Sequence, residues 1–277
     1  MRTRTAFLMP VYNPDPARLR LTLDSLRAQT VAADIVLVDD GSSPPVEALL
    51  DDGAITLLRL PRNAGIVAAL NHGLRYLLES GYEYIARMDC GDLCLPNRIA
   101  AQQEVMDRSH DLDLLGSRAE IVDEAGQLLF VEGVSGDRAC VRRKLWDNAA
   151  FKHPTFFLRA RSVARLGLYS PRYTHAEDYE FMRRYAERGH VACLDDVLLV
   201  YEKTAAGLCG RNRGAQLRSR LRAQLRYFDP RAARAYLGVA RTIVTMLVPG
   251  RLWSAASRLY WRAREGRAAA SWPAAAP

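Results

Sequence analysis

The sequence predicts an α/β fold in which helices flank a mostly parallel β-sheet, followed by a basic helical tail. Short apolar runs alternate along the chain with segments whose apolar residues recur at helical spacing. Such alternation is typical of parallel sheets with right-handed crossovers. The apolar runs also end in acidic and turn-forming residues, and the charge of the chain changes sign near residue 205.

A β-α-β unit opens the chain. Residues 6–11 and 34–38 are short apolar runs of the kind that form buried strands. Between them, Leu19, Leu23 and Leu26 recur at helical spacing. Asp15 precedes this periodic segment, so we expect it to cap the helix.

The same pattern repeats downstream. Residues 55–60 and 84–88 are the next predicted strands, and residues 64–79 between them form the clearest helix, with one apolar face. A further helix is expected at residues 96–106. In such sheets ligands bind beyond the carboxyl ends of the strands, so the residues that follow these strands should gather in one site.

Beyond residue 110 the alternation loosens, but no internal repeat and no low-complexity linker interrupts the chain before the tail. Residues 1–204 are therefore interpreted as one domain. Its remaining expected elements are a strand, a hairpin and two helices, at residues 112–115, 120–122 with 127–131, 137–147 and 178–188.

Charge separates this domain from the tail. The whole chain carries +8, to which residues 1–204 contribute −4 and residues 205–277 contribute +12. We expect residues 205–267 to form a basic amphipathic helical tail and residues 268–277 to be disordered. A basic block usually indicates an anionic partner such as a membrane surface or nucleic acid, although a solvated basic face has the same composition.

Two stripes in the tail favour the membrane. Apolar residues recur every three or four positions beside arginines four residues apart, as in helices that lie on an anionic bilayer. The segment expected to bind is residues 211–264; helices that pack on the preceding domain or form a dimer are the alternative. A nucleic-acid partner is not expected, because no nucleic-acid module is recognisable. The stripes consist of Leu217, Leu221, Leu225 and Phe228, and of Arg218, Arg222 and Arg226.

Several classes of protein lose support from the sequence. No stretch reaches the roughly 18 apolar residues of a membrane-spanning helix. The apolar run near the N-terminus is too short for a signal peptide.

The cysteines and the glycines exclude further classes. The five cysteines lack zinc-type Cys-x-x-Cys pairs, which fits free thiols. Without Gly-x-Gly-x-x-Gly or Gly-Lys-Ser/Thr loops, a dinucleotide oxidoreductase or a P-loop phosphotransferase is disfavoured. We therefore expect a cytoplasmic chain.

Five short motifs follow one another between residues 5 and 204. They are Met9-Pro10-Val11-Tyr12-Asn13, Val38-Asp39-Asp40-Gly41-Ser42, Asn63-Ala64-Gly65-Ile66 with Asn71, residues 87–92, and Ala176-Glu177-Asp178. Each motif is weak alone, but the ordered set resembles the family 2 inverting glycosyltransferases of the GT-A fold. The resemblance implies a GT-A type, Rossmann-like sheet and a nucleotide-sugar site at its rim.

In that family the first two motifs form the base pocket. The resemblance implies that Tyr12 stacks on or flanks a uracil or thymine and that Asp39 accepts its N3 proton. A plain turn at residues 40–42 and a simple helix cap at Asn63 are the alternatives. The other residues that the resemblance places in the nucleotide-sugar site are Pro10, Asn13, Asp40, Asn63, Gly65, Asn71 and Arg87.

The resemblance also implies a divalent metal, Mg²⁺ or Mn²⁺, held by Asp89 and Asp92. Similar proteins carry Asp-x-Asp-Asp here, whereas this chain has Gly91 at the third position. Glycine has no side-chain ligand, but two carboxylates completed by diphosphate oxygens and water can hold such an ion. The alternatives are that Asp92 merely caps the following helix, or that an arginine stabilises the leaving group without metal.

Catalysis is implied for the last motif. Asp178 would deprotonate the acceptor hydroxyl as general base, beside Glu177 at the start of a helix. The helix dipole alone also favours acidic residues there. Arg184 would orient this pair or lie on the surface, and His153 would lie near the acceptor or be structural.

These observations predict an inverting glycosyltransferase of the hexosyltransferase type. It would move a sugar from a UDP- or dTDP-linked donor to a hydroxyl of a lipid-linked or polysaccharide acceptor. Surface glycan biosynthesis on the inner face of the cytoplasmic membrane is the expected setting. A non-catalytic nucleotide-sugar-binding protein, suggested by Gly91, is the first alternative, and a nucleic-acid-binding protein is the second. The sequence assigns no oligomeric state.

Overall fold

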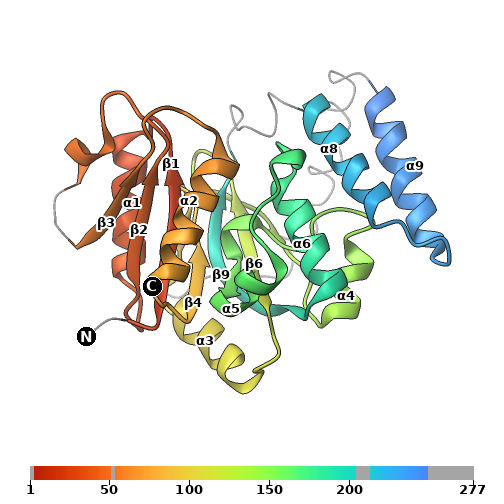
Figure 1. Cartoon of the computed structure of the whole chain (residues 1–277), viewed down its shortest axis with the longest axis horizontal. Helices are drawn as coiled ribbons and strands as arrows, with labels where there is room; N and C mark the ends of the chain where they lie inside the picture. Colours follow the sequence, from red (N-terminus) through yellow and green to blue (C-terminus); the bar gives the residue numbers. More distant parts are fainter. Residues whose placement is uncertain (1–2, 51–53, 204–212, 249–277) are drawn as a thin grey trace.

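A computed structural model describes residues 3–50, 54–203 and 213–248. Within them the chain forms a nine-stranded sheet with helices packed on both faces (Figure 1). The expected α/β class is confirmed. Across the sheet the strands run β3 (Ile55–Arg59), β2 (Asp34–Asp39), β1 (Thr5–Val11), β4 (Tyr84–Arg87), β8 (Phe157–Arg159), β6 (Leu114–Val122), β9 (Val191–Glu202) and β5 (Leu93–Cys94), and β7 (Leu128–Glu132) pairs with β6.

The first four strands form a parallel half-sheet, as predicted. β1 pairs in parallel with both β2 and β4, and β2 pairs in parallel with β3. In the second half, β6 and β9 are parallel, while β8 runs antiparallel to β4 and β6. The predicted hairpin is the antiparallel pair of β6 and β7.

Alternation along β1 explains why both faces carry helices. Ala6 and Leu8 point into one core cluster, and Phe7 and Met9 point into the other. The first core contains apolar residues of α2 (Ile66–Glu79), α4 (Arg138–Lys144), α5 (Ala160–Leu166) and α6 (Glu177–Arg188), and the second contains those of α1 (Pro16–Arg27) and α3 (Arg98–Arg108).

Two helices begin where the sequence predicts. Asp15 caps α1 as predicted, because its side chain accepts a hydrogen bond from the Arg18 amide at 2.9 Å. α6 begins at Glu177, close to the predicted start. The strand expected at residues 112–115 instead extends to Val122 as β6, and the sequence did not predict β5, β8, β9 and α5. β5 and β8 are too short to show a period, and two acidic residues interrupt the apolar run of β9.

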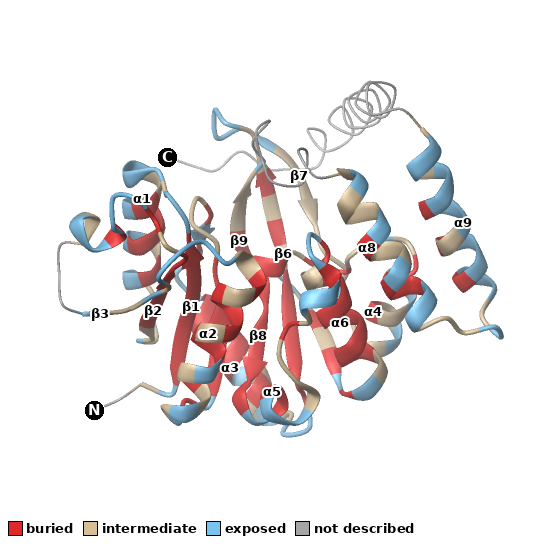
Figure 2. Cartoon of the chain, turned by 45° about the horizontal axis from the view of Figure 1, so that its top comes forward, coloured by how far each residue is buried: buried red, intermediate tan, exposed pale blue. Residues whose placement is uncertain are grey.

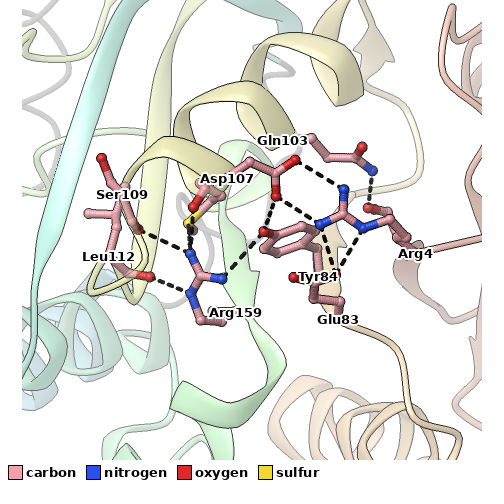
Figure 3. A network of polar contacts seen from close by, with 10 residues as sticks. Arg4, Glu83, Tyr84, Gln103, Asp107, Ser109, Leu112 and Arg159 are labelled. Carbon is pink, nitrogen blue, oxygen red and sulfur yellow. Dashed lines mark hydrogen bonds and ion pairs between the residues drawn. The ribbon is translucent and has the colours of Figure 1, made fainter.

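A polar network secures the end of the sheet where β1 and β4 begin (Figure 3). Arg4 pairs with Asp107 of α3 and with Glu83, and the Tyr84 hydroxyl donates to Asp107 at 2.6 Å. Arg159 of β8 donates to the same hydroxyl at 3.3 Å and to carbonyls around the end of α3. The hydrogen bonds from Arg4 lower the pKa of Asp107 to about 2. These contacts join β4, β8 and α3, and leave the opposite ends of the parallel strands for a ligand.

Two helices of the tail lie within the described residues. α8 (Arg213–Arg226) packs against α6 and against α9 (Ala233–Leu247), and the Ser219 hydroxyl donates to the carbonyl of Thr174 at 2.8 Å. The alternative of packing on the preceding domain therefore holds for α8. Residues 205–212 and 249–277, which include the rest of the expected tail, lie outside the described residues.

Much of α9 is exposed (Figure 2), and apolar residues form one of its exposed faces. Leu237, Val244 and Leu247 are exposed on it, at 68%, 59% and 77% of their surfaces, and Tyr236, Ile243 and Met246 are exposed beside them. In the part of the chain that the structure describes, no helix combines the length and the apolar character needed to cross a bilayer.

Candidate active site

The carboxyl ends of the parallel strands bring the first motifs to one rim. Val11 of β1 is in register with Asp39 of β2, and Leu8 of β1 is in register with Arg87 at the end of β4. The turns that follow these strands are therefore neighbours, although about 75 residues separate Val11 from Arg87 in the sequence. Pro10 lies buried within β1.

A network of hydrogen bonds shapes the turns after β1 and β2. Asp39 is fully buried, and its Oδ1 accepts from the Ser42 amide at 2.8 Å. The Asn13 amide donates to Ser42 Oγ at 2.8 Å, which links the two turns. Tyr12 stands 52% exposed beside them. The arrangement leaves the Tyr12 ring accessible for stacking, while the Asp39 carboxylate is engaged by its own turn.

Asp40 fixes the next motif. Its two carboxylate oxygens accept from the Ala64 amide at 2.8 Å and from the Gly65 amide at 2.9 Å, just before α2. Gly41 has φ of +73°, and a Cβ there would lie 2.5 Å from the carbonyl carbon of Arg62. The turn and the start of α2 thus meet backbone against backbone, with Asn63 exposed at the junction.

Asn71 has a partner that the sequence did not indicate. Its Nδ2 donates to the carbonyl of Tyr169 and its Oδ1 accepts from the Tyr169 amide, both at 2.9 Å. The side chain thereby joins α2 to the segment after α5. A cavity of about 380 Å³ opens beside this junction, between α2 and Thr174. Donor binding by Asn71 stays a prediction.

The loop after β4 holds the two predicted metal ligands. Arg87, only 3% exposed, forms an ion pair with Asp89. Asp92 is 4% exposed; its Oδ1 accepts from the Glu202 amide at 3.3 Å, and its Oδ2 is buried with no hydrogen-bond partner. Burial, reinforced by the negative charge of Asp89, raises the pKa of Asp92 well above its ordinary value.

Asp89 and Asp92 fit a metal ion only if a bound diphosphate and water complete the coordination shell of that ion. Among residues 3–50, 54–203 and 213–248, no group of three or more His, Cys, Asp or Glu side chains is arranged to hold an ion. The orphaned oxygen of Asp92 and the half-exposed Asp89 offer two carboxylates, which suits Mg²⁺ or Mn²⁺ with diphosphate and water. The idea that Asp92 only caps α3 is wrong, because Asn97 occupies the N-cap position.

The two predicted catalytic carboxylates lie at the N-terminus of α6. The Glu177 Oε2 atom is buried without a hydrogen-bond partner, and burial together with the charge of Asp178 raises the pKa of Glu177 to about 7. Asp178 Oδ1 accepts from the Tyr179 amide at 2.7 Å. Burial also raises the pKa of Asp178, while the positive charge of Arg87 lowers it. Arg87 therefore lies near enough to link this pair electrostatically with the loop after β4.

His153 and Arg184 are both buried. His153 Nε2 shares a 2.7 Å hydrogen bond with the Tyr169 hydroxyl, and burial lowers the pKa of this histidine well below its ordinary value. Arg184 donates to Glu180 and to the carbonyls of residues 166–168. The expectation that Arg184 could lie on the surface is wrong, because it secures the segment after α5. Contact of either side chain with an acceptor stays a prediction.

The structure adds residues that no motif indicated. Lys152 pairs with Glu132 at 2.9 Å, and its charge lowers the pKa of both Asp92 and Asp178. Arg18 of α1 pairs with Glu202 at the end of β9. Each of these pairs joins residues 20 or more positions apart, so no local pattern could reveal them.

Comparison with known proteins gives a consistent result. The model of the family described as Glycosyl transferase family 2 matches residues 6–167. An uncharacterized glycosyltransferase of Haemophilus influenzae is 30% identical over 216 residues, which cover 75% of this chain and 78% of that protein. The amylovoran biosynthesis glycosyltransferase AmsE of Erwinia amylovora is 32% identical over 200 residues, covering 69% of this chain and 73% of AmsE.

Solved structures share the fold at low identity. TarS 1–349 of S. aureus, in complex with UDP-GlcNAc, superposes with a TM-score of 0.63 at 17% identity, over 88% of this chain and 72% of that one. The mannosyltransferase PcManGT of Pyrobaculum calidifontis, with GDP-Man and Mn²⁺, gives 0.61 at 17% identity, over 99% and 77%. The GT-A type fold is thereby confirmed. With this fold, the family match and the motifs assembled at one rim, the chain belongs to glycosyl transferase family 2.

Proposed function

We propose that this glycosyltransferase moves a hexose, with inversion, from a UDP- or dTDP-linked donor to an acceptor hydroxyl. The observation that carries the proposal is the pair of half-buried carboxylates at the start of α6, which are influenced by the charge of Arg87, as is the loop after β4. Asp178 is the proposed general base, since a carboxylate within reach of the hydroxyl can take its proton during in-line attack. Glu177 completes the pair.

The donor would lie along the rim of the parallel strands. Tyr12 would flank the base, and the turn held by Asp40 would bring the backbone of Gly65 toward the nucleotide. Asp89 and Asp92 would hold Mg²⁺ or Mn²⁺, which compensates the charge of the diphosphate. The Mn²⁺ in the mannosyltransferase structure supports this cofactor.

The acceptor is proposed to be a lipid-linked or polysaccharide glycan. The Erwinia relative, named for amylovoran biosynthesis, supports a role in the assembly of a polysaccharide. We place the enzyme on the inner face of the cytoplasmic membrane, with the exposed apolar face of α9 and its neighbouring arginines on the bilayer. In this proposal α8 contributes less to membrane contact than its stripes indicated, because it packs on α6.

A donor screen tests the activity. Purified protein is incubated with UDP-, dTDP- and GDP-linked sugars and a mixture of lipid-linked and oligosaccharide acceptors, and products are detected by mass spectrometry. GDP-linked donors are included because one structural neighbour carries GDP-Man. Glycosylated product whose new anomeric configuration is opposite to that of the donor, observed by NMR, supports the proposal; retention of configuration contradicts it.

A non-catalytic nucleotide-sugar-binding protein is the competing function, favoured by the absence of a carboxylate at Gly91. It predicts donor binding with neither transfer nor hydrolysis for every donor and acceptor in the screen. Measuring binding by calorimetry beside turnover on the same samples separates the two functions.

A further inference from the structure

Gly91 replaces the carboxylate that similar proteins carry in the loop after β4, and the structure shows which group stands beside it. A Cβ built on Gly91 would meet Arg18 Nη1, at 4.0 Å. Arg18 lies in the first turn of α1, more than 70 residues away in the sequence. A fixed positive charge is therefore the neighbour of the position from which the family motif would project a negative one.

α1 is anchored to this loop. The Thr22 hydroxyl donates to the carbonyl of Asp92 at 2.9 Å and accepts from the Gly91 amide at 3.0 Å. Arg18 lies four residues before Thr22, so both side chains occupy the same face of α1. The packing of α1 thus places Arg18 beside the loop, and an ion pair with Glu202 holds its guanidinium there.

Arg18 also belongs to the network of the candidate ligands. Its Nη2 pairs with Glu202 Oε1 at 2.5 Å, and the Glu202 amide donates to Asp92 Oδ1. Arg18 and Arg87 differ in their access to solvent. Arg87 is buried and paired with Asp89, whereas the side chain of Arg18 is 43% exposed. Arg18 can therefore reach a bound anion, whereas Arg87 forms an ion pair with a carboxylate of the protein.

We propose that Arg18 binds the diphosphate of the donor and of the departing nucleoside diphosphate. Its guanidinium can donate two parallel hydrogen bonds to phosphate oxygens. Glu202 holds the guanidinium over the loop before nucleotide binds, and the diphosphate then displaces this carboxylate as its partner. The positive charge of Arg18 compensates the charge of the diphosphate whether or not a metal is bound at Asp89 and Asp92. It thereby makes up for the metal ligand that is missing at Gly91. The inference rests on the proposed function.

Binding measurements on five proteins test this role. Calorimetry compares the wild type with Arg18→Gln, Glu202→Gln, the double variant that combines these two changes, and the control Arg20→Gln, an exposed arginine of the same helix. Each is titrated with UDP, GDP and dTDP, first in excess EDTA and then with Mg²⁺. Thermal melting confirms that all five fold alike.

We expect Arg18→Gln to weaken binding of the preferred nucleoside diphosphate about tenfold in EDTA, as for loss of a charge-assisted contact. Glu202→Gln should strengthen it severalfold, because the competing negative charge is removed, and should have no effect when combined with Arg18→Gln. Binding of the nucleoside without phosphates, followed by saturation-transfer NMR, should not change. Arg20→Gln should match the wild type.

Two results overturn the inference. One is equal affinity of Arg18→Gln and Arg20→Gln for the diphosphate in EDTA; the other is an equal loss of nucleoside and nucleoside diphosphate binding, which would indicate a structural role. If the wild type binds no nucleoside diphosphate in either buffer, the proposed function itself fails, and this inference fails with it.

Discussion

Arg87 and Asp89 form an ion pair at the carboxyl end of β4. The charge of this buried guanidinium also acts on the other carboxylates of the candidate site. Its charge lowers the pKa of Asp92, Glu177 and Asp178, although burial outweighs it and keeps all three raised. Two of these carboxylates have an oxygen with no hydrogen-bond donor. Arg87 Nε is likewise buried without an acceptor, so the site leaves polar atoms of both kinds unsatisfied, as expected of a place that binds a polar ligand.

Asp178→Asn should abolish transfer and leave donor binding intact. The amide cannot take the acceptor proton, so turnover should fall by roughly 10²–10⁴-fold. Turnover is measured by nucleotide release, and donor affinity by calorimetry. Asp196→Asn, at an exposed position of β9, is the matched control. Turnover within about tenfold of the wild type would exclude Asp178 as the base.

Removal of the metal should slow turnover, because the diphosphate loses charge compensation. We expect EDTA to reduce the rate and added Mn²⁺ or Mg²⁺ to restore it. Asp89→Ala should weaken donor binding in the presence of metal, with a smaller effect in EDTA. Full activity in EDTA would contradict the assignment of Asp89 and Asp92 as metal ligands. An arginine would then stabilise the leaving group.

Stability should depend on pH through Glu177. Because its pKa is raised in the folded state to about 7, the folded protein binds more protons than the unfolded chain between the ordinary pKa of 4.5 and about 7. The contribution of Glu177 to stability is therefore complete below pH 4.5 and is lost as the pH rises through about 7. Melting temperatures of the wild type and Glu177→Gln, measured between about pH 4 and pH 8, should diverge in favour of the variant as the pH rises. A constant difference would contradict the raised pKa.

Asp40→Ala should destabilise the protein and weaken donor binding together. The variant leaves the amides of Ala64 and Gly65 without their carboxylate acceptor, at a cost of about 2–3 kcal/mol in the free energy of unfolding. Urea unfolding gives the stability change, and calorimetry with the nucleotide gives the affinity. Asp40→Asn should be milder, because one amide oxygen remains to accept. A stability equal to that of the wild type would show that this clamp is dispensable.

The uncovered face of α9 should bind anionic membranes. The full chain should sediment with liposomes that contain anionic lipid at low salt. It should dissociate from them as the salt concentration is raised, because salt screens the attraction between the arginines and the lipid headgroups. Leu237→Glu combined with Val244→Glu should abolish retention, whereas Leu128→Glu, an exposed leucine of β7, should not. If the double variant sediments like the wild type, the face serves another purpose, such as contact between two copies of the chain.

The sequence by itself determined what depends on short-range order. Strand positions in the parallel half of the sheet, the Asp15 cap, the start of α6 and the order of the motifs all followed from periodicity and local side-chain chemistry. The sequence also predicted that Tyr12, Asp39 and Asp89 gather at one rim, because parallel strands bring their carboxyl ends together.

Only the tertiary structure decided the partners of the polar side chains. The pairs of Arg18 with Glu202 and of Asn71 with Tyr169 join residues 184 and 98 positions apart. It likewise showed that α8 packs on α6 while α9 keeps an apolar face exposed. A local pattern records that a helix is amphipathic or that an arginine is present. Which surface covers that helix, and which carboxylate meets that arginine, depends on burial and charge contributed by distant segments once they pack together.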